Sequence, residues 1–238
     1  MTSKVCVVIP AYNEETTIAG TIKDYKRHFP EAVFVVIDNN SKDRTSEVAA
    51  AELDKNRDYL LFEQRQGKGV AVKTGLSRVS ADVYVLTDGD ETYPATEAAR
   101  LLQLLLKTRS DMVVGDRVSG GDYDKQNDRI GHGAGNRVLT RIVSWLSGKK
   151  YRDVMSGLRI MSRPFIDQVD VRSAGFQLET ELNIIAANIR ADVIESPIIY
   201  SARGEGSESK LNTIQDGVRI LYFAVINWIA FYPLQIFS

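Results

Sequence analysis

The sequence predicts an α/β fold with a mostly parallel sheet and helices on both of its faces. Short apolar runs alternate with segments whose apolar residues recur at helical spacing, mainly in the first half of the 238 residues. The runs are nearly continuous in apolar residues, which is typical of strands covered on both faces. Polar clusters follow several runs, at the strand ends where ligands collect in parallel sheets. These observations favour one parallel α/β unit with a binding site along one edge.

The apolar runs define the predicted strands. We expect strands over 5–10, 33–38, 59–62, 83–88, 112–115 and 193–200. Polar clusters follow the first, second and fourth of these, at 10–14, 38–41 and 88–90. Because the carboxyl ends of parallel strands share one edge, we expect these clusters to meet.

The predicted helices lie between and after these strands. Helical spacing of apolar residues predicts helices over 14–27, 43–53, 68–79, 94–107 and 136–148. The segment 115–135 is rich in Gly and Asp and has no periodic apolar face, so it predicts a long loop. No internal repeat or low-complexity linker occurs, which predicts one domain over residues 1–212 and an appended segment over 213–238.

The appended segment is apolar. No charged residue follows Arg219, and the run approaches the length of a membrane span, although Asn227, Pro233 and Gln235 weaken it. Two interpretations stay open: a terminal helix docked on the core, and a helix that lies on a membrane or leads into spans. We expect the second, a C-terminal helical segment close to the membrane.

The composition limits the class of protein and its compartment. The 30 basic and 31 acidic residues nearly cancel, whereas a general nucleic-acid binder usually has a basic excess. Cys6 is the one cysteine in the sequence, which excludes an internal disulfide and suits a reducing compartment. The N-terminus begins in a strand-like run without signal-peptide features. We therefore expect a cytoplasmic protein, at the inner face of the membrane.

The carboxylates of "TDGDETYP" follow the fourth predicted strand. In one interpretation Asp88 caps the next helix and Asp90 lies in solvent; in the other, both bind a divalent cation. Residues i and i+2 of extended chain point the same way, and Gly89 between them allows a close approach of backbone or ligand. Carboxylate oxygens suit Mg²⁺ or Mn²⁺, which would neutralise a diphosphate leaving group. We expect the metal-binding role.

Eight motifs, in order, resemble those of family-2 glycosyltransferases with the GT-A fold. They are "VVIPAYNEE", "VVIDNNSKDRT", "GKGVAVKTGL", "VLTDGDETYP", "MVVGDRVSGG", "DVMSGLRIMSR", "GFQLETEL" and "ESPIIYSARGEGSESKL". The sequence is most similar to the dolichol-phosphate mannose synthase-like branch, which includes bacterial polyprenyl-phosphate glycosyltransferases. The resemblance implies a Rossmann-like GT-A sheet and metal-dependent, inverting transfer from a UDP- or GDP-sugar to a membrane polyprenyl phosphate. A homo-oligomer remains an open alternative.

The resemblance also implies roles for individual residues. The nucleotide-binding positions are Pro10, Ala11, Tyr12, Glu14, Asp38, Lys68, Asp88 and Gly89. The metal ligands are Asp88 and Asp90, with Asp88 nearer the donor. The positions that act on the diphosphate, the donor sugar or the acceptor are Asp90, Arg117, Arg129, Glu179, Arg203 and Lys210. Thr92 departs from the branch, where Gln is common, which leaves a third metal or phosphate contact open.

The nature of the acceptor decides whether a general base is required. A polyprenyl phosphate is already anionic, whereas a sugar hydroxyl must lose a proton as it attacks. We expect a phosphate acceptor, because the second half of the chain supplies several Arg and Lys residues. The alternative is transfer to a hydroxyl of a lipid-linked or polymeric glycan, with Glu179 or Glu181 as the base. A silent nucleotide-sugar-binding subunit is a third alternative, disfavoured by the intact Asp-Gly-Asp.

Overall fold

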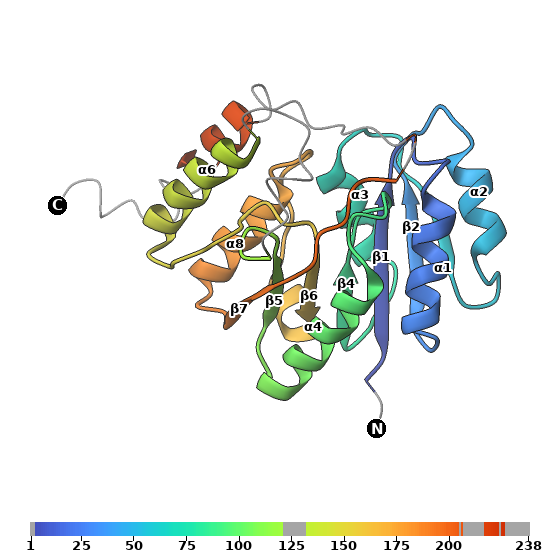
Figure 1. The fold of residues 1–238 in the computed structure, drawn as a ribbon, viewed down its shortest axis with the longest axis horizontal. Coiled ribbons are helices and arrows are strands. Elements are labelled where there is room, and N and C mark those ends of the chain that lie inside the picture. Colours follow the sequence, from blue (N-terminus) through green and yellow to red (C-terminus); the bar gives the residue numbers. More distant parts are fainter. Residues whose placement is uncertain (1–2, 121–131, 205, 207–216, 224, 227–238) are drawn as a thin grey trace.

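The structure is a computed structural model that describes residues 3–120, 132–204, 206, 217–223 and 225–226. A seven-stranded sheet with the order β3-β2-β1-β4-β6-β5-β7 runs through its centre (Figure 1). The strands are β1 (Val5–Ala11), β2 (Val33–Asp38), β3 (Tyr59–Phe62), β4 (Val83–Leu86), β5 (Met112–Asp116), β6 (Arg159–Ser162) and β7 (Val193–Pro197).

The sheet is mostly parallel, as predicted. The pairs β1–β2, β1–β4, β2–β3 and β5–β7 are parallel, whereas β6 is antiparallel to both β4 and β5. Strand β6 was not predicted, because a four-residue strand that begins with Arg159 does not read as a buried apolar run. The guanidinium is nevertheless fully buried, and it donates to the carbonyls of Ser156 and Val154 and to the side-chain oxygen of Asn183. Hydrogen bonds of this kind make a buried polar group tolerable.

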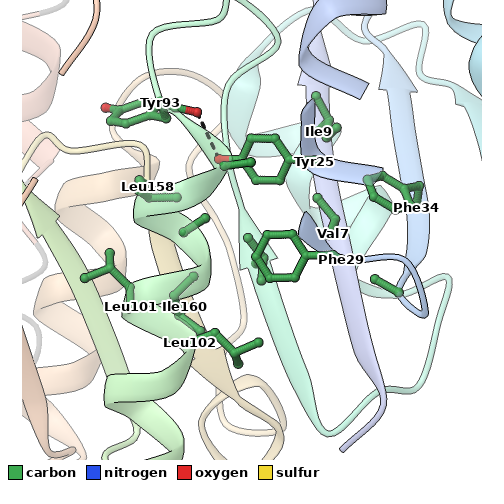
Figure 2. Packing of buried hydrophobic residues seen from close by; sticks show 14 of the residues in the cluster. Val7, Ile9, Tyr25, Phe29, Phe34, Tyr93, Leu101, Leu102, Leu158 and Ile160 are labelled. Carbon is green, nitrogen blue, oxygen red and sulfur yellow. Dashed lines mark hydrogen bonds between the residues drawn. The ribbon is translucent and has the colours of Figure 1, made fainter. Parts of the chain in front are cut away.

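Helices cover both faces of the sheet. They are α1 (Ile18–His28), α2 (Thr45–Glu52), α3 (Lys68–Leu76), α4 (Ala95–Thr108), α6 (His132–Ser147), α7 (Arg163–Ile166) and α8 (Leu178–Asn188). One core cluster packs α1 and α4 on the sheet, and a second packs α3 and α8 on it. Figure 2 shows the first cluster, in which the Tyr25 hydroxyl donates to the Tyr93 carbonyl at 3.2 Å. This bond ties α1 to the loop after β4.

Several predicted boundaries were wrong. Strand β4 ends at Leu86, two residues before the predicted end at Asp88, because its pairing with β6 stops at Leu86. Strand β7 ends at Pro197 rather than at residue 200, because its partner strand β5 ends at Asp116, which pairs with Pro197. Helix α6 begins at His132 rather than at residue 136. Its first turn is rich in glycine, and the tertiary packing of Leu139 and Val143 further along the helix stabilises it.

The C-terminal segment is described in part. Residues 217–223 are helical, and Ile220 is fully buried in a third cluster with Leu139 and Val143 of α6. The docked interpretation therefore holds for the start of this segment. In the part of the chain that the structure describes, no helix combines the length and apolarity needed to cross a bilayer. Residues 227–238 lie outside the described residues, so the membrane interpretation stays a prediction.

Candidate active site

The polar clusters after β1, β2 and β4 meet at one edge of the sheet, as predicted. The backbone N–H of Asn39 donates to the Ala11 carbonyl at 2.8 Å, which joins the ends of β1 and β2. The Thr17 hydroxyl donates to the Gly89 carbonyl at 2.9 Å and joins the start of α1 to the loop after β4. The site is therefore assembled from loops on three adjacent strands.

Lys68 lies between two carboxylates of this site. Its ammonium is 2.5 Å from Asp88 Oδ1 and 2.6 Å from Glu179 Oε1. The three side chains come from the start of α3, the loop after β4 and the start of α8, and the Lys68 side chain is only 12% exposed. Burial alone would lower the pKa of Lys68, but the charges of Asp88 and Glu179 outweigh it and raise this pKa above its usual value. Lys68 is therefore a cation at neutral pH.

Asp90 is buried and has its own partners. Its Oδ2 is ion-paired with Arg203, and its Oδ1 accepts hydrogen bonds from the hydroxyl of Thr92 at 2.6 Å and the N–H of Thr92 at 3.2 Å. Burial, followed by the nearby charge of Asp88, raises the pKa of Asp90 above its ordinary value. Thr92, the departure from the branch pattern, thus orients one of the predicted metal ligands.

Arg203 reaches Asp90 on a segment that we call the strap, residues 198–204. The strap leaves β7 and crosses toward the loop after β4, where it is visible as an orange-red trace (Figure 1). The Ser201 N–H donates to the Thr92 carbonyl at 3.0 Å, and the Gly204 N–H donates to the Asp90 carbonyl at 3.3 Å. The strap therefore brings a cation from the far edge of the sheet to the paired aspartates.

Backbone contacts fix the position of Lys68. The Gly67 N–H donates to Asn39 Oδ1 at 2.7 Å, and Gly67 has a φ of 140°. A Cβ at Gly67 would lie 2.0 Å from the Ala174 carbonyl oxygen, so this position requires glycine for both reasons. Glu181 accepts the N–H groups of Arg172 and Ser173, which holds the segment beside α3. Glu181 thus acts on the backbone around Lys68.

The residues present fit a divalent cation. Asp88 and Asp90 supply hard oxygen donors, and a Cβ at Gly157 would lie 2.6 Å from Asp88 Oδ2, so a side chain at this position would collide with the carboxylate. Among the described residues no group of three or more His, Cys, Asp and Glu side chains forms a ready-made metal site. Two carboxylates completed by substrate phosphates and water are a usual Mg²⁺ arrangement. The predicted roles of Asp88 and Asp90 fit this donor set and remain predictions.

The predicted nucleoside residues lie at the ends of β1 and β2. Asp38 is buried and accepts from the Ser41 N–H at 2.9 Å and from the Ser46 hydroxyl. Glu14 is also buried, and its carboxylate accepts from the Thr17 hydroxyl at 3.0 Å. The remaining positions of this group are Pro10, Ala11 and Tyr12, which end or follow β1. Their binding roles stay predictions.

Arg117 lies near the site but has a carboxylate partner. Its guanidinium donates to both oxygens of Asp153, at 2.7 and 2.8 Å, and lies over the Tyr200 ring, 5.5 Å from the centroid. Burial alone would raise the pKa of Asp153, but Arg117 holds this pKa below its usual value. Asp153 was not predicted as a functional residue, although it opens the quoted motif "DVMSG". Arg129 and Lys210, the other predicted cations, lie outside the described residues.

Comparisons with known proteins identify the family and agree with this fold. Residues 6–169 match the family described as glycosyl transferase family 2. The glycosyltransferase AglJ of Haloferax volcanii is 34% identical over 217 residues, which are 90% of this chain and 68% of that protein. A dolichyl-phosphate hexose transferase of the same organism is 32% identical over 215 residues, or 90% of this chain and 89% of that protein.

A solved structure shares the fold. Glucosyl-3-phosphoglycerate synthase from Mycobacterium tuberculosis, in complex with Mn²⁺, UDP and glucosyl-3-phosphoglycerate, superposes with a TM-score of 0.74 at 19% identity. The alignment covers 95% of this chain and 80% of that one, which supports the GT-A-like assignment of the sheet. The chain is a glycosyltransferase. It belongs to glycosyl transferase family 2.

Proposed function

We propose that this protein transfers a sugar, with inversion and with the help of a divalent cation, from a nucleotide sugar to a polyprenyl phosphate. Its similarity to a dolichyl-phosphate hexose transferase over nearly the full length of both chains supports this acceptor. The Mn²⁺ and UDP in the structural neighbour support the donor class and the metal. The donor is a UDP- or GDP-sugar.

The proposal of a phosphate acceptor rests mainly on the contacts that the two candidate general bases make within the protein. Glu179 is ion-paired with Lys68 at 2.6 Å, and Glu181 accepts two backbone N–H groups. A carboxylate that removes a proton must instead reach the attacking hydroxyl. With both carboxylates engaged within the protein, an acceptor that is already anionic suits this site better than a hydroxyl.

The chain's own residues bind, orient and neutralise. Glu14 and Asp38 border the nucleoside pocket, and Asp88 and Asp90 hold the divalent cation. That cation, when bound, makes the diphosphate a better leaving group. Lys68 and Arg203 face the same region and contribute positive charge where the diphosphate develops negative charge. Arg129 and Lys210 are proposed to orient the acceptor phosphate.

An exposed apolar surface supports association with a membrane. Trp145 of α6 is 75% exposed, and Tyr222 of the C-terminal helical segment is 69% exposed. These helical segments pack together through Ile220. Aromatic side chains of this kind favour the membrane–water interface. We propose that this surface contacts the inner face of the membrane, where the lipid acceptor is presented.

An assay that compares two acceptors tests the proposal. The purified full chain is incubated with Mn²⁺, labelled UDP- or GDP-sugars, and vesicles that hold either a polyprenyl phosphate or a polyprenyl-diphosphate-linked sugar. We expect label only in the polyprenyl phosphate fraction. Label only in the lipid-linked sugar would favour the alternative, transfer to a sugar hydroxyl.

A further inference from the structure

The predicted metal ligands are already paired with cations of the protein. Asp88 Oδ1 is 2.5 Å from the Lys68 ammonium, and Asp90 Oδ2 is ion-paired with Arg203. The two cations come from different places, the start of α3 and the strap. Each predicted ligand therefore has one of its two oxygens occupied by an internal positive charge.

We propose that Lys68 and Arg203 are resident counter-ions of the metal site, so that a divalent cation binds tightly only together with a nucleotide diphosphate. This inference rests on the proposed function, because it takes Asp88 and Asp90 as the metal ligands. It adds a role for Lys68 and Arg203 before the substrate arrives: they keep the metal ligands neutralised and suppress binding of the metal alone.

The charge balance of the cluster supports this role. Three carboxylates, those of Asp88, Asp90 and Glu179, contact two cations, Lys68 and Arg203, so these five groups carry one net negative charge. A divalent cation bound alone would reverse the sign of the cluster and lie close to both protein cations. Asp90 is buried and Lys68 nearly so, and like charges repel more strongly where water is scarce. Metal binding alone is therefore opposed.

A diphosphate removes this opposition. Its anionic oxygens offer Lys68 and Arg203 new partners, and both ammonium and guanidinium groups bind phosphate well. As the cations turn to the diphosphate, the oxygens of Asp88 and Asp90 become available to the metal. Lys68 can make this exchange without losing its contact with Glu179, which anchors it from the other side. Metal and nucleotide should therefore bind cooperatively, and to the same extent in either order.

The placement of Lys68 differs from that of an ordinary surface lysine. Lys73 lies on the same helix, but its side chain is 57% exposed and its partner Asp170 is 68% exposed. Lys68 is instead 12% exposed and contacts two carboxylates. Lys73 therefore provides a matched control, since its removal deletes the same charge from the same helix outside the cluster.

Binding of Mn²⁺ in the absence of a sugar donor tests the proposal without measuring activity. The full chain is titrated with Mn²⁺, and free Mn²⁺ is followed by electron paramagnetic resonance, first alone and then with UDP or GDP. We expect Lys68→Met to bind Mn²⁺ alone about tenfold or more tightly than the unaltered protein, within the usual range of coupling between sites. Arg203→Met should shift the affinity in the same direction, and Lys73→Met should leave it unchanged.

Nucleotide dependence gives the second readout. In the unaltered protein, UDP or GDP should strengthen Mn²⁺ binding markedly, and this gain should shrink in Lys68→Met and Arg203→Met. Thermal unfolding shows whether the variants are still folded. Mn²⁺ alone should raise the Tm of Lys68→Met more than that of the unaltered protein, because a ligand stabilises the state that binds it.

The outcomes separate the two proposals. An unchanged or weaker affinity of Lys68→Met and Arg203→Met for Mn²⁺ alone would overturn the counter-ion role, whatever the nucleotides do. Failure of both UDP and GDP to strengthen Mn²⁺ binding in the unaltered protein would contradict the proposed donor chemistry and the cooperativity together, whereas a nucleotide gain that is unchanged in both variants would contradict the counter-ion role alone.

Discussion

The carboxylate of Glu181 accepts a hydrogen bond from the backbone N–H of Ser173 at 3.0 Å. Its other oxygen accepts the N–H of Arg172 at 2.9 Å. The segment that Glu181 holds continues to Ala174, whose carbonyl oxygen accepts the N–H of Val70 in α3. Glu181, a candidate general base by its sequence motif, therefore supports helix α3, which begins at Lys68.

Replacing Glu181 therefore affects stability more than the chemical step. Glu181→Gln should lower the free energy of unfolding by about 1.5–3 kcal/mol, the usual worth of hydrogen bonds to a charged group. The turnover number should fall less than about tenfold, whereas loss of a base typically costs about 10² to 10⁴. Urea unfolding and steady-state rates measure the two effects. A loss of turnover beyond a hundredfold with little change in stability would restore Glu181 as a base.

The metal assignment predicts a large effect at Asp90. Asp90→Ala should retain the fold but lose about a hundredfold or more in the rate of transfer, because Lewis-acid stabilisation is worth several kcal/mol and about 1.36 kcal/mol is tenfold in rate. Asp170→Ala removes an exposed carboxylate outside the site and serves as the control. Near-normal turnover of Asp90→Ala in Mg²⁺ or Mn²⁺ would show that Asp90 is not a metal ligand.

The buried pair of Arg117 and Asp153 predicts a pH-dependent stability. Asp153→Asn leaves Arg117 without its carboxylate and should cost about 3–5 kcal/mol at neutral pH, as for other broken buried pairs. Since the folded-state pKa of Asp153 is lowered, its contribution is complete above the unfolded value of about 3.9 and is lost as the pH falls through the folded value.

Unfolding of both proteins in urea at several pH values checks this. The difference between the unaltered protein and Asp153→Asn should be constant from neutral pH to about pH 4–5 and shrink below it. Asp167→Asn, at an exposed pair with Arg163, should show little difference at any pH. A difference that persists undiminished at the lowest pH would contradict the ionic role of Asp153.

The proposed membrane surface predicts a loss of lipid binding. The double variant Trp145→Ser, Tyr222→Ser should bind anionic vesicles at least several-fold more weakly in a sedimentation assay, because it removes the two most exposed aromatic side chains among the described residues. Phe62→Ser provides a matched control, since Phe62 is 58% exposed on the edge strand β3. If both changes weaken vesicle binding equally, or if the double variant does not weaken it, the proposed membrane surface is wrong.

Much of the fold follows from local patterns. The strands around Val7, Val35 and Val85 are continuous apolar runs, and helices α1 and α4 have clear apolar faces. Their secondary structure can therefore be predicted without tertiary information. Strand β6 is different. Arg159 is acceptable within the sheet because Asn183 and the carbonyls of Ser156 and Val154 surround it, and the partner Asn183, which is distant in sequence, leaves no local signal.

The candidate active site also has a part that local sequence predicts and a part that depends on tertiary structure. The motif around Asp88 and Asp90 was found because carboxylates after a buried strand are unusual, and the structure brings Lys68, Glu179 and Arg203 to them. The pairing of those charges was not predicted. It depends on the strap and on the packing of α3 against the segment after α7, which the sequence order does not reveal.

Treatment of the labelled product with mild acid distinguishes transfer to a polyprenyl phosphate from transfer to a sugar hydroxyl. The full chain is incubated with Mn²⁺, the labelled nucleotide sugar that it accepts, and vesicles containing both polyprenyl phosphate and a polyprenyl-diphosphate-linked sugar, and the labelled lipid is then treated with mild acid. A sugar joined to a phosphate is acid-labile, whereas a sugar joined to a sugar hydroxyl is far more stable. We expect mild acid to release the label from the lipid as a single sugar. Release of the label only as part of a larger glycan, in which the bond between the two sugars has survived mild acid, would contradict transfer to a lipid phosphate. No transfer of label to polyprenyl phosphate by an enzyme that turns over its donor with another acceptor would contradict it as well.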